Sequence, residues 1–403
     1  MNTVADFDPW SPSFTADPYP VYASLRERGR AHWFEPARQW LIPHYDDVSA
    51  LLRDRRLGRT YLHRFSHEEF GRTAPSAAHG PFHTLNGSGL LDLEGEDHTR
   101  IRRLVAKAFT PRTVERLVPT IRRLAEELVD DLVARGGGDL IATVAEPLPV
   151  AVIAEMLGIP ESDRGLLRPW SADICGMFEL NPSEETARRA VSASLEFTAY
   201  LRDLIVERRR SPGEDLVSAL IAAHDAEDRL TEQEMISTCV LLLNAGHEAT
   251  VNSTGNGWLT LFHHPEQLAR LRAAPEELLA PAIEELLRYD TPLQMFERWV
   301  LEDIEVGGTV IPRGSEVALL FGSANRDPAR FERPDELDLS RADNPHITFG
   351  AGIHYCLGAP LARLELAASF GTLLRRAPRL RLAAEPEWTG FVIRGLRELR
   401  VEV

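Results

Sequence analysis

One cysteine lies in a glycine-framed turn directly before a long amphipathic helix, and this arrangement strongly limits what the chain can fold into. Residues 349–358 read Phe-Gly-Ala-Gly-Ile-His-Tyr-Cys-Leu-Gly, and a helix is predicted over 359–376. The glycines allow tight turns and the close approach of a flat group. Cys356 meets the free N–H groups and the positive dipole end of the helix, which favour a thiolate. Such a thiolate suits an axial ligand of haem iron, whereas the alternative is a free cysteine packed as a small hydrophobic residue.

The surrounding residues favour the first interpretation. Residues 349–358 resemble the cysteine-ligand loop of the cytochrome P-450 family, whose pattern is F-G-x-G-x-x-x-C-x-G, and residues 359–365 look like its bacterial form. The resemblance covers essentially the whole chain and is densest over 241–365. It implies a mainly α fold with a small β part and a long central helix over the haem. It also implies heme b (iron protoporphyrin IX) as the cofactor, with Cys356 as the metal ligand.

The composition is that of an ordinary soluble globular protein, with 44% hydrophobic and 26% charged residues. The net charge of −16 argues against nucleic acid as a partner. Cys175, Cys239 and Cys356 lie far apart, so neither a zinc site nor a disulfide framework is predicted. Residues 1–20 lack a signal-peptide pattern, and no apolar run approaches the ~18 residues of a membrane span. We therefore expect a cytoplasmic protein without a membrane anchor.

Hydrophobic periodicity predicts a mainly helical single domain over residues 1–403. The predicted helices span 19–28, 45–53, 97–109, 118–135, 144–157, 161–178, 183–210, 215–225, 231–263, 265–273, 276–289 and 359–376. Short strands are predicted around 40–42, 299–300, 305–306, 310–311, 316–321 and 391–403. Residues 57–91 show no sustained period, which predicts a long loop with one helical turn. Such loops are often functional.

A charged pair on the helix of residues 276–289 is predicted to be structural. Glu285 and Arg288 are three residues apart, so they share a face and can pair. They resemble the E-x-x-R helix of the family. The resemblance implies that Arg341, from the irregular segment 325–344, joins them in a buried network that holds the cysteine loop.

Four side chains match the family's partners of the two haem propionates. His98 and Arg102 are four residues apart on one helix face and match the H-x-x-x-R motif. Arg298 matches a strand arginine, and His354, two residues before the cysteine, matches a further donor. The alternative for each of them is an ordinary surface salt bridge.

The long helix carries a second family motif. Residues 241–250 read Leu-Leu-Leu-Asn-Ala-Gly-His-Glu-Ala-Thr and resemble the oxygen-binding helix, whose pattern is A/G-G-x-D/E-T. Its small residues would let another group approach closely. Glu248 matches the acid that helps to deliver protons, a general-acid role. The next residue is normally a threonine but is Ala249 here. Thr250 follows, but one step along a helix rotates a side chain by ~100°, so its hydroxyl should not simply replace the missing one.

Alignment to these motifs also implies a substrate pocket. Its expected residues, beside the loop of 57–91 and the helix pair around 177–182, are Asn244, Ala245, Gln294, Phe296, Val392 and Ile393. For Asn244 the alternative is a cap of a local helix distortion. For the apolar members the alternative is an ordinary core position.

The resemblance implies a bacterial-type monooxygenase that hydroxylates or epoxidises a small organic molecule. Because Ala249 lacks the hydroxyl that normally organises proton delivery, we expect a polar group of the substrate to hold the water that relays protons, with help from Asn244 and Thr250. This predicts a functionalised substrate, such as a polyketide, a macrolide or an aromatic natural product.

The enzyme would use O2 and electrons from a ferredoxin or flavodoxin with a reductase. An acidic partner of this kind could bind a basic face formed by Arg103, Lys107, Arg112, Arg363, Arg375 and Arg376. The missing threonine leaves oxidative coupling or ring closure open. Retention of Glu248 argues against a peroxide-driven enzyme and against a non-catalytic haem sensor or carrier.

Overall fold

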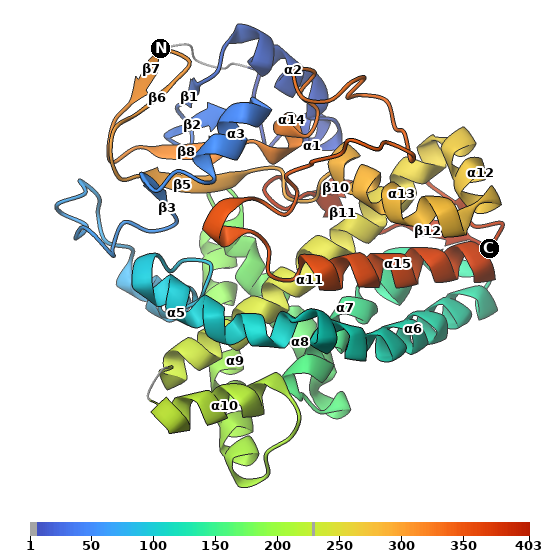
Figure 1. The fold of residues 1–403 in the computed structure, drawn as a ribbon, viewed down its shortest axis with the longest axis horizontal. Helices are drawn as coiled ribbons and strands as arrows, with labels where there is room; N and C mark the ends of the chain where they lie inside the picture. Colours follow the sequence, from blue (N-terminus) through green and yellow to red (C-terminus); the bar gives the residue numbers. More distant parts are fainter. Residues whose placement is uncertain (1–5, 228–229) are drawn as a thin grey trace. The chain divides into compact units, whose positions relative to one another are not determined.

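A computed structural model describes residues 6–227 and 230–403, and it is mainly helical with a few short strands, as predicted (Figure 1). Contacts divide the described residues into two compact units. Unit 1 is drawn from Met1–Gly58, Arg122–Pro147 and Ala249–Val403, and unit 2 from Arg59–Ile121 and Leu148–Glu248. The organisation of residues 1–403 as one domain stays a prediction. Within the described residues, no helix is both long and apolar enough to cross a membrane.

Unit 2 is built from helices. They are α4 (Gly80–Gly87), α5 (Gly95–Val105), α8 (Arg164–Cys175), α9 (Glu184–Arg210) and α10 (Leu216–Glu227), with short turns η1 (Ala77–His79), η2 (Ala106–Phe109), η4 (Glu161–Asp163) and η5 (Gly176–Phe178). Three further helices contribute residues to both units: α6 (Pro111–Ala134), α7 (Pro147–Leu157) and α11 (Glu232–His263). α11 passes from unit 2 to unit 1 between Glu248 and Ala249.

Unit 1 combines helices with the strands. Its helices and turns are α1 (Pro12–Ala16), α2 (Tyr19–Arg28), α3 (Tyr45–Leu51), η3 (Ile141–Ala145), α12 (Pro265–Ala273), α13 (Pro275–Tyr289), α14 (Phe321–Ala324), η6 (Gly352–His354) and α15 (Ala359–Arg376). The largest sheet has the order β1 (His32–Phe34), β2 (Gln39–Ile42), β8 (Glu316–Leu319), β5 (Phe296–Val300) and β3 (Leu57–Gly58). Only β2 and β8 pair in parallel within it.

Three smaller pairings complete unit 1. β4 (Gly137–Asp139) and β9 (Arg381–Leu382) flank β12 (Arg400–Glu402), β6 (Ile304–Val306) pairs with β7 (Thr309–Ile311), and β10 (Trp388–Thr389) pairs with β11 (Gly395–Leu396). β4 was not predicted, because the sequence at 136–138 indicates only the end of a helix. A Cβ on Gly137, whose φ is 125°, would lie 2.2 Å from the carbonyl oxygen of Val401. The strand therefore needs glycine for its close pairing with β12.

Residues 57–91 differ in part from their prediction. A helix of two turns, α4, replaces the single turn expected, and it begins with Gly80 and Pro81. Proline is tolerated in a first helical turn, where its missing N–H has no partner in any case. α4 buries only Phe82 and Leu85. Two apolar positions after a glycine–proline pair are too weak a periodic signal to predict a helix.

An ion pair and a hydrogen bond within unit 2 join the start of this segment to the residues just after its end. The guanidinium of Arg59 pairs with Asp92 at 3.0 Å, and its backbone N–H donates to Glu94 at 2.7 Å. Tyr61 stacks on Phe70 with ring centroids 4.1 Å apart, and both rings are buried. The segment therefore has an aromatic core of its own, as compact functional loops often do.

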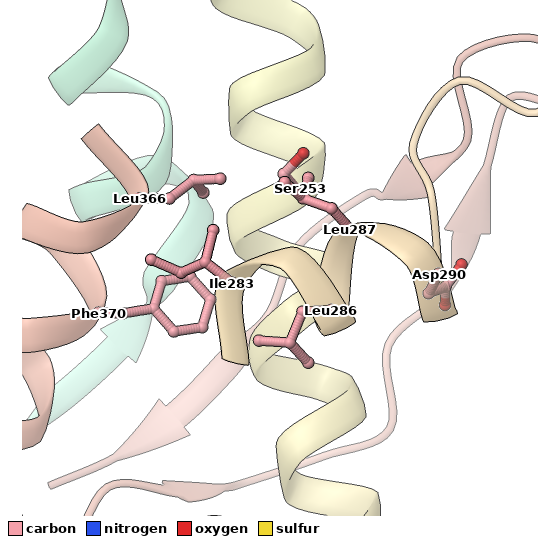
Figure 2. A pocket seen from close by; sticks show the side chains of 7 residues that line it. All are labelled: Ser253, Ile283, Leu286, Leu287, Asp290, Leu366 and Phe370. Atoms are coloured by element: carbon pink, nitrogen blue, oxygen red, sulfur yellow. The ribbon is translucent and has the colours of Figure 1, made fainter. Parts of the chain in front are cut away.

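Helices α11, α13 and α15 of unit 1 enclose a small cavity (Figure 2). It is lined by Ser253, Ile283, Leu286, Leu287, Asp290, Leu366 and Phe370. Its free volume is about 10 Å³, the space of at most one water molecule. A substrate of drug-like size needs a far larger cavity, so this is a packing defect and not a binding site.

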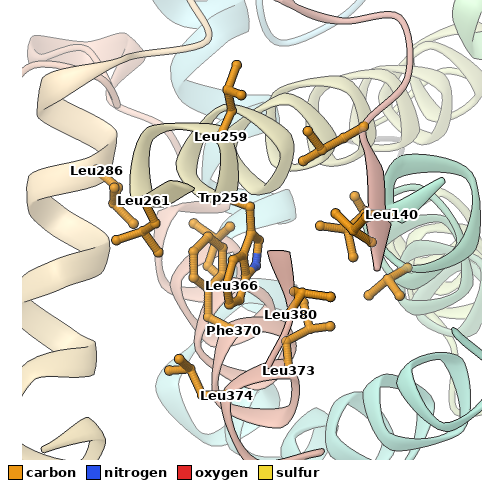
Figure 3. Close-up of a cluster of buried hydrophobic side chains, with 14 of the residues drawn as sticks. Leu140, Trp258, Leu259, Leu261, Leu286, Leu366, Phe370, Leu373, Leu374 and Leu380 are labelled. Atoms are coloured by element: carbon orange, nitrogen blue, oxygen red, sulfur yellow. The ribbon is translucent and has the colours of Figure 1, made fainter. Parts of the chain in front are cut away.

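The apolar core of unit 1 lies around the same helices (Figure 3). Trp258 of α11 stacks on Phe370 of α15 with centroids 5.1 Å apart and an interplanar angle of 19°. A Cβ on Gly257 would lie 2.9 Å from the Phe370 ring, so glycine lets the two helices approach closely. Both rings are fully buried, and such pairs stabilise a core beyond their buried area.

Glu365 of α15 is an exception in this apolar environment. Its side chain is 2% exposed, and one carboxyl oxygen, Oε1, has no hydrogen-bond partner among the described residues. Burial raises the pKa of Glu365 to about 8. The carboxyl is therefore mainly protonated at neutral pH in the folded state.

This burial predicts a stability that falls as the pH rises. The folded-state pKa of about 8 lies above the ordinary value of 4.5, so the folded chain binds the proton more tightly than the unfolded chain. The stability from this group is complete below pH ~4.5 and is lost as the pH rises toward 8. We expect Glu365→Gln to remove this loss and to stabilise the protein at pH 8–9 by a few kcal/mol, visible as a higher thermal midpoint. The exposed Glu266→Gln is the matched control, and an unchanged pH dependence in Glu365→Gln would contradict the assignment.

Candidate active site

The cysteine loop of unit 1 is held by its own backbone. The N–H of Cys356 donates to the carbonyl of Phe349 at 2.9 Å. Gly350 and Gly352 have φ values of 68° and 70°, in the left-handed region that favours glycine. A Cβ on Gly352 would also lie 2.4 Å from the carbonyl oxygen of Leu52. A side chain at Gly350 or Gly352 would therefore strain the backbone, and one at Gly352 would also clash with the carbonyl of Leu52.

Cys356 differs from the other two cysteines in its environment. It is partly exposed and lies three residues before Ala359, the first residue of α15. Cys175 and Cys239 are buried, and burial raises the pKa of both thiols, that of Cys239 to about 12. Those two sulfurs are thiols at neutral pH. Only Cys356 combines access with the N–H groups and dipole of a helix start, which favour a thiolate.

The buried charge network predicted on α13 is confirmed. Arg288 donates to both oxygens of Glu285 at 2.8 Å, and Arg341 Nε donates to the same carboxylate at 3.1 and 3.2 Å. Glu285 and Arg288 are 0% exposed. Arg288 also donates to the backbone carbonyls of Asn325 and Pro334 at 2.9 and 2.7 Å. The network therefore fixes the irregular segment 325–344 against α13.

Two polar side chains connect that segment to the cysteine loop. Thr348 Oγ1 donates to the carbonyl of Leu287 at 2.8 Å and accepts from Asn325 Nδ2 at 3.1 Å. Asn325 Oδ1 accepts from the N–H of Ile347 at 2.9 Å. These bonds fix the backbone just before the loop begins. Sequence reasoning missed them, because single polar residues in an irregular segment give no periodic signal.

Arg363 of α15 is engaged inside unit 1. It donates to both oxygens of Glu284 at 2.6 and 2.7 Å, and its guanidinium lies 4.5 Å from the centre of the Phe349 ring. Burial alone would raise the pKa of Glu284, but hydrogen bonds from Arg363 and His346 lower it to about 2. The cation therefore supports the ring at the start of the cysteine loop.

This pairing changes the predicted basic face. Arg375 pairs with Glu126 at 3.2 Å, and Arg376 pairs with Asp130 at 3.7 Å, which joins α15 to α6 (Figure 1). Together with Arg363, half of the six cations are thus neutralised within unit 1. The other three, all in unit 2, are exposed and make no ion pair with the described residues: Arg103, Lys107 and Arg112.

The predicted propionate partners of unit 1 lie on two elements. Arg298, on β5, is 3% exposed and donates from Nη1 to the carbonyl of Glu297 at 2.8 Å. Its guanidinium lies 4.5 Å from the centre of the Phe296 ring. His354 belongs to the cysteine loop itself, in the turn η6, and is partly buried.

Four of the predicted pocket residues come from two neighbouring segments of unit 1. The N–H of Gln294 donates to the carbonyl of Val392 at 3.0 Å, and Ile393 forms a β-bridge with the residue before Gln294. Phe296 follows two residues later. The Gln294 side chain, however, is fully buried: its Oε1 accepts from Tyr22 at 2.9 Å, and its Nε2 donates to Thr291 at 2.7 Å. Both polar atoms of the Gln294 amide are therefore hydrogen-bonded to residues of unit 1.

In unit 2, α5 carries the other two propionate candidates. His98 is 2% exposed, and Arg102 is half-buried. Arg100, between them, donates to both oxygens of Glu234 on α11 at 2.5 and 3.2 Å and to Asp97 at 2.8 Å. Burial alone would raise the pKa of Glu234, but the bond from Arg100 lowers it. This pair fixes α5 against α11, a role that the helix pattern alone did not indicate.

The unit 2 part of α11 holds three predicted site residues. Ala245 is exposed, and Glu248 is partly exposed, with 23% of its side chain accessible. Asn244 is 4% exposed, and its Oδ1 has no hydrogen-bond partner among the described residues. A Cβ on Gly246 would lie 2.9 Å from Ile153 of α7. The missing side chain at this glycine therefore allows close packing of α7.

In unit 1, the helix continues with the two remaining predicted catalytic positions. Ala249 is partly exposed, whereas Thr250 is only 6% exposed. The hydroxyl of Ser253, one turn later, donates to the carbonyl of Ala249 at 2.7 Å. The side chain at 250 thus lies inside the unit, and the hydroxyl at 253 is bonded to backbone.

The comparisons with known proteins identify the family of the chain. The chain matches the family model for Cytochrome P450 over residues 171–377. It is 39% identical over 408 residues to the polyketide biosynthesis cytochrome P450 PksS of Bacillus subtilis. The alignment covers 98% of each chain. It is 39% identical over 409 residues to the cytochrome P450 monooxygenase PikC of Streptomyces venezuelae. The alignment covers 99% of this chain and 94% of PikC.

A solved structure has the same fold. The crystal structure of P450BioI in complex with a hexadec-9Z-enoic acid ligated acyl carrier protein is similar with a TM-score of 0.91 and 37% identity, covering 98% of this chain and 100% of that one. The chain belongs to the cytochrome P450 family, and it is a haem-dependent monooxygenase. The donor set fits a haem iron, because Cys356 is the one cysteine whose surroundings favour a thiolate, in a loop whose glycines leave room for a flat group.

Proposed function

We propose that this enzyme hydroxylates or epoxidises a functionalised natural product of the polyketide, macrolide or aromatic type. It would use O2 and electrons from a ferredoxin or flavodoxin with its reductase. The name of PksS, a polyketide biosynthesis enzyme, supports this substrate class. The three free cysteines fit a reducing compartment, so we place the enzyme in the cytoplasm.

We assign the cofactor site as follows. The group would be heme b, which supplies oxygen activation when bound, and the Cys356 thiolate would ligate its iron. In unit 1, Arg298 and His354 would bind propionate through charge-assisted hydrogen bonds, and in unit 2 His98 and Arg102 would do so. Each of the four lies at the position of the corresponding family motif.

The proton chemistry belongs to α11. Glu248 holds a proton at its carboxyl group and passes it to the reaction through water, since its side chain is partly exposed. Something must orient that water. No hydroxyl is present at Ala249, Thr250 is inside the unit, and Ser253 is bonded to backbone. The missing hydroxyl is the observation behind our proposal that a polar group of the substrate orients the water, with help from Asn244, and therefore that the substrate is functionalised. The burial of Thr250 argues against the help that was expected from its hydroxyl.

A substrate series tests this proposal. We expect that removing the substrate hydroxyl or carbonyl nearest the oxidised carbon increases peroxide release per NAD(P)H several-fold, because proton delivery loses its organiser. Ala249→Thr should reduce that difference by restoring a hydroxyl. The measurement is product and peroxide yield with labelled O2, in wild type and in Ala249→Thr. Equal peroxide release across the series would show that the substrate does not assist.

The same missing hydroxyl favours a second candidate, oxidative coupling or ring closure. Coupling removes electrons and protons from a phenol or indole and forms a new bond without inserting oxygen. The labelled-oxygen measurement separates the two. Label in the product supports the monooxygenase reaction, and a product without label supports coupling.

A further inference from the structure

Glu284 of α13 and Arg363 of α15 form an ion pair beside the cysteine loop that the proposed function does not use. Arg363 donates from Nε and Nη2 to the two carboxylate oxygens of Glu284 at 2.6 and 2.7 Å. Two parallel bonds of this kind are the strong form of an arginine–carboxylate pair. The side chains of Arg363 and Glu284 are 36% and 30% exposed, so the pair is partly shielded from water. Both residues belong to unit 1, as does the whole loop.

The cation of this pair contacts both ends of the cysteine loop. Its guanidinium lies 4.5 Å from the centre of the Phe349 ring, and the carbonyl of Phe349 accepts from the N–H of Cys356 at 2.9 Å. Arg363 also hydrogen-bonds to the side chain of Tyr355, the residue directly before Cys356. The positive charge is therefore held against one residue that is bonded to the proposed iron ligand and another that adjoins it.

A histidine completes this cluster without adding a charge. His346 Nε2 lies 3.0 Å from Glu284 Oε2, and the N–H of Thr348 donates to His346 Nδ1 at 3.4 Å. A ring nitrogen that accepts a hydrogen bond carries no proton, so the ring is neutral and its one N–H, at Nε2, donates to Glu284. The cluster therefore holds one negative charge, on Glu284, and one positive charge, on Arg363.

We infer that Glu284 and Arg363 are positioning residues for the iron ligand and that the balance of their charges sets the reduction potential of the iron. This inference rests on the proposed ligation by Cys356. Reduction adds an electron to the site, so a nearby cation favours the reduced iron and a nearby anion favours the oxidised iron. Groups around a metal ligand tune its metal in this way. Each charge of the pair opposes the effect of the other, so removing one leaves the other unbalanced.

Two single substitutions should shift the potential in opposite directions. Arg363→Gln removes the cation and should lower the reduction potential, whereas Glu284→Gln removes the anion and should raise it. We expect each to change the equilibrium between oxidised and reduced iron about three- to tenfold, which corresponds to ~30–60 mV. The double variant should return close to wild type. The measurement is a redox titration of the haem-loaded protein without substrate, at low ionic strength because salt screens partly exposed charges.

A purely structural role predicts a different pattern. A loop loosened by lost hydrogen bonds would move the potential in the same direction in both single variants, and further in the double variant. Arg363→Lys keeps the charge but loses the planar two-bond fork, so its equilibrium should stay within about twofold of wild type while amide hydrogen exchange in residues 349–356 becomes faster. The controls are Glu387→Gln and Arg397→Gln, at a pair of unit 1 whose side chains are both 68% exposed, and neither should change either quantity.

The C–O stretching frequency of the reduced carbon monoxide complex is a second readout. A cation near the sulfur withdraws electron density from the iron, which then donates less to carbon monoxide, so the frequency rises. Arg363→Gln should therefore lower the frequency and Glu284→Gln should raise it. Shifts of the same sign in these two variants, or no shift of frequency and potential in either, would overturn the inference. If Glu284→Gln does not fold, Arg363→Gln against Arg363→Lys separates charge from geometry in the same way.

Failure of the proposed function would look different. If Cys356→Ser retains the thiolate-type absorption band, Cys356 is not the iron ligand, whatever the potentials show. If Cys356→Ser loses that band but Arg363→Gln and Glu284→Gln do not shift the potential in opposite directions, the ligand is correct and only the role of the charge pair is wrong.

Discussion

Replacing Cys356 by serine is expected to abolish the thiolate-type absorption band of the reduced carbon monoxide complex. A serine hydroxyl stays protonated at a helix start where a cysteine ionises, so the iron would lose its anionic sulfur ligand. The backbone bond from residue 356 to Phe349 does not depend on the side chain, so the loop should keep its conformation. The measurement is the difference spectrum of the reduced protein with and without carbon monoxide.

Cys239→Ala is the control for this experiment. Cys239 is buried and its thiol pKa is raised by burial, so it offers no thiolate, and its removal should leave the spectrum unchanged. Retention of the thiolate band in Cys356→Ser would contradict the proposed ligand. Loss of the band in Cys239→Ala, with the band retained in Cys356→Ser, would show that Cys239 is the iron ligand and not Cys356.

Glu285→Gln is expected to destabilise the protein by about 3–5 kcal/mol, because it leaves Arg288 and Arg341 without their shared counter-charge. Typical domains unfold at a cost of only about 5–15 kcal/mol, so much of the stability would be lost. The cysteine loop depends on the segment that this network holds, so haem retention should fall too. Urea unfolding and the haem-to-protein ratio measure the two effects.

The same substitution at an exposed pair provides the control. Glu336 pairs with Arg333 at 2.7 Å on the surface of the same irregular segment, with side chains 62% and 59% exposed. Exposed pairs contribute about 0–1 kcal/mol, so Glu336→Gln should unfold and bind haem nearly as wild type does. Similar losses in both variants would show that the buried network has no special role.

The sequence predicted best those features that depend on neighbouring residues. The bounds of α2, α12 and α15 were predicted correctly, because their apolar period is long and proline or glycine marks their ends. The Glu285–Arg288 pair follows from its spacing on one helix, and the family pattern supplied Arg341. The strand β4 was missed because its partner is remote in sequence.

The candidate site shows the same division. Motif spacing predicts the cysteine ligand and Glu248 as site residues, but spacing does not reveal which partner a side chain finds. The glycine at 246 serves packing against Ile153, the amide of Gln294 is bonded inside unit 1, and Arg363 is neutralised by Glu284. Each of these outcomes depends on a segment brought close only by the fold.

The pairing of β4 with β12 has a consequence for how the protein is made. Leu399, just before β12, donates to Asp139 of β4 across 260 positions of sequence. A ribosome that has finished β4 must add all the intervening residues before its partner strand exists. Val129, Leu132 and Leu140, which belong to the apolar core of unit 1, must wait for Leu399 and Val401 during that time. Unit 1 therefore cannot complete its core during early translation, and its nascent chain should depend on chaperones that shield apolar segments until synthesis has passed β12.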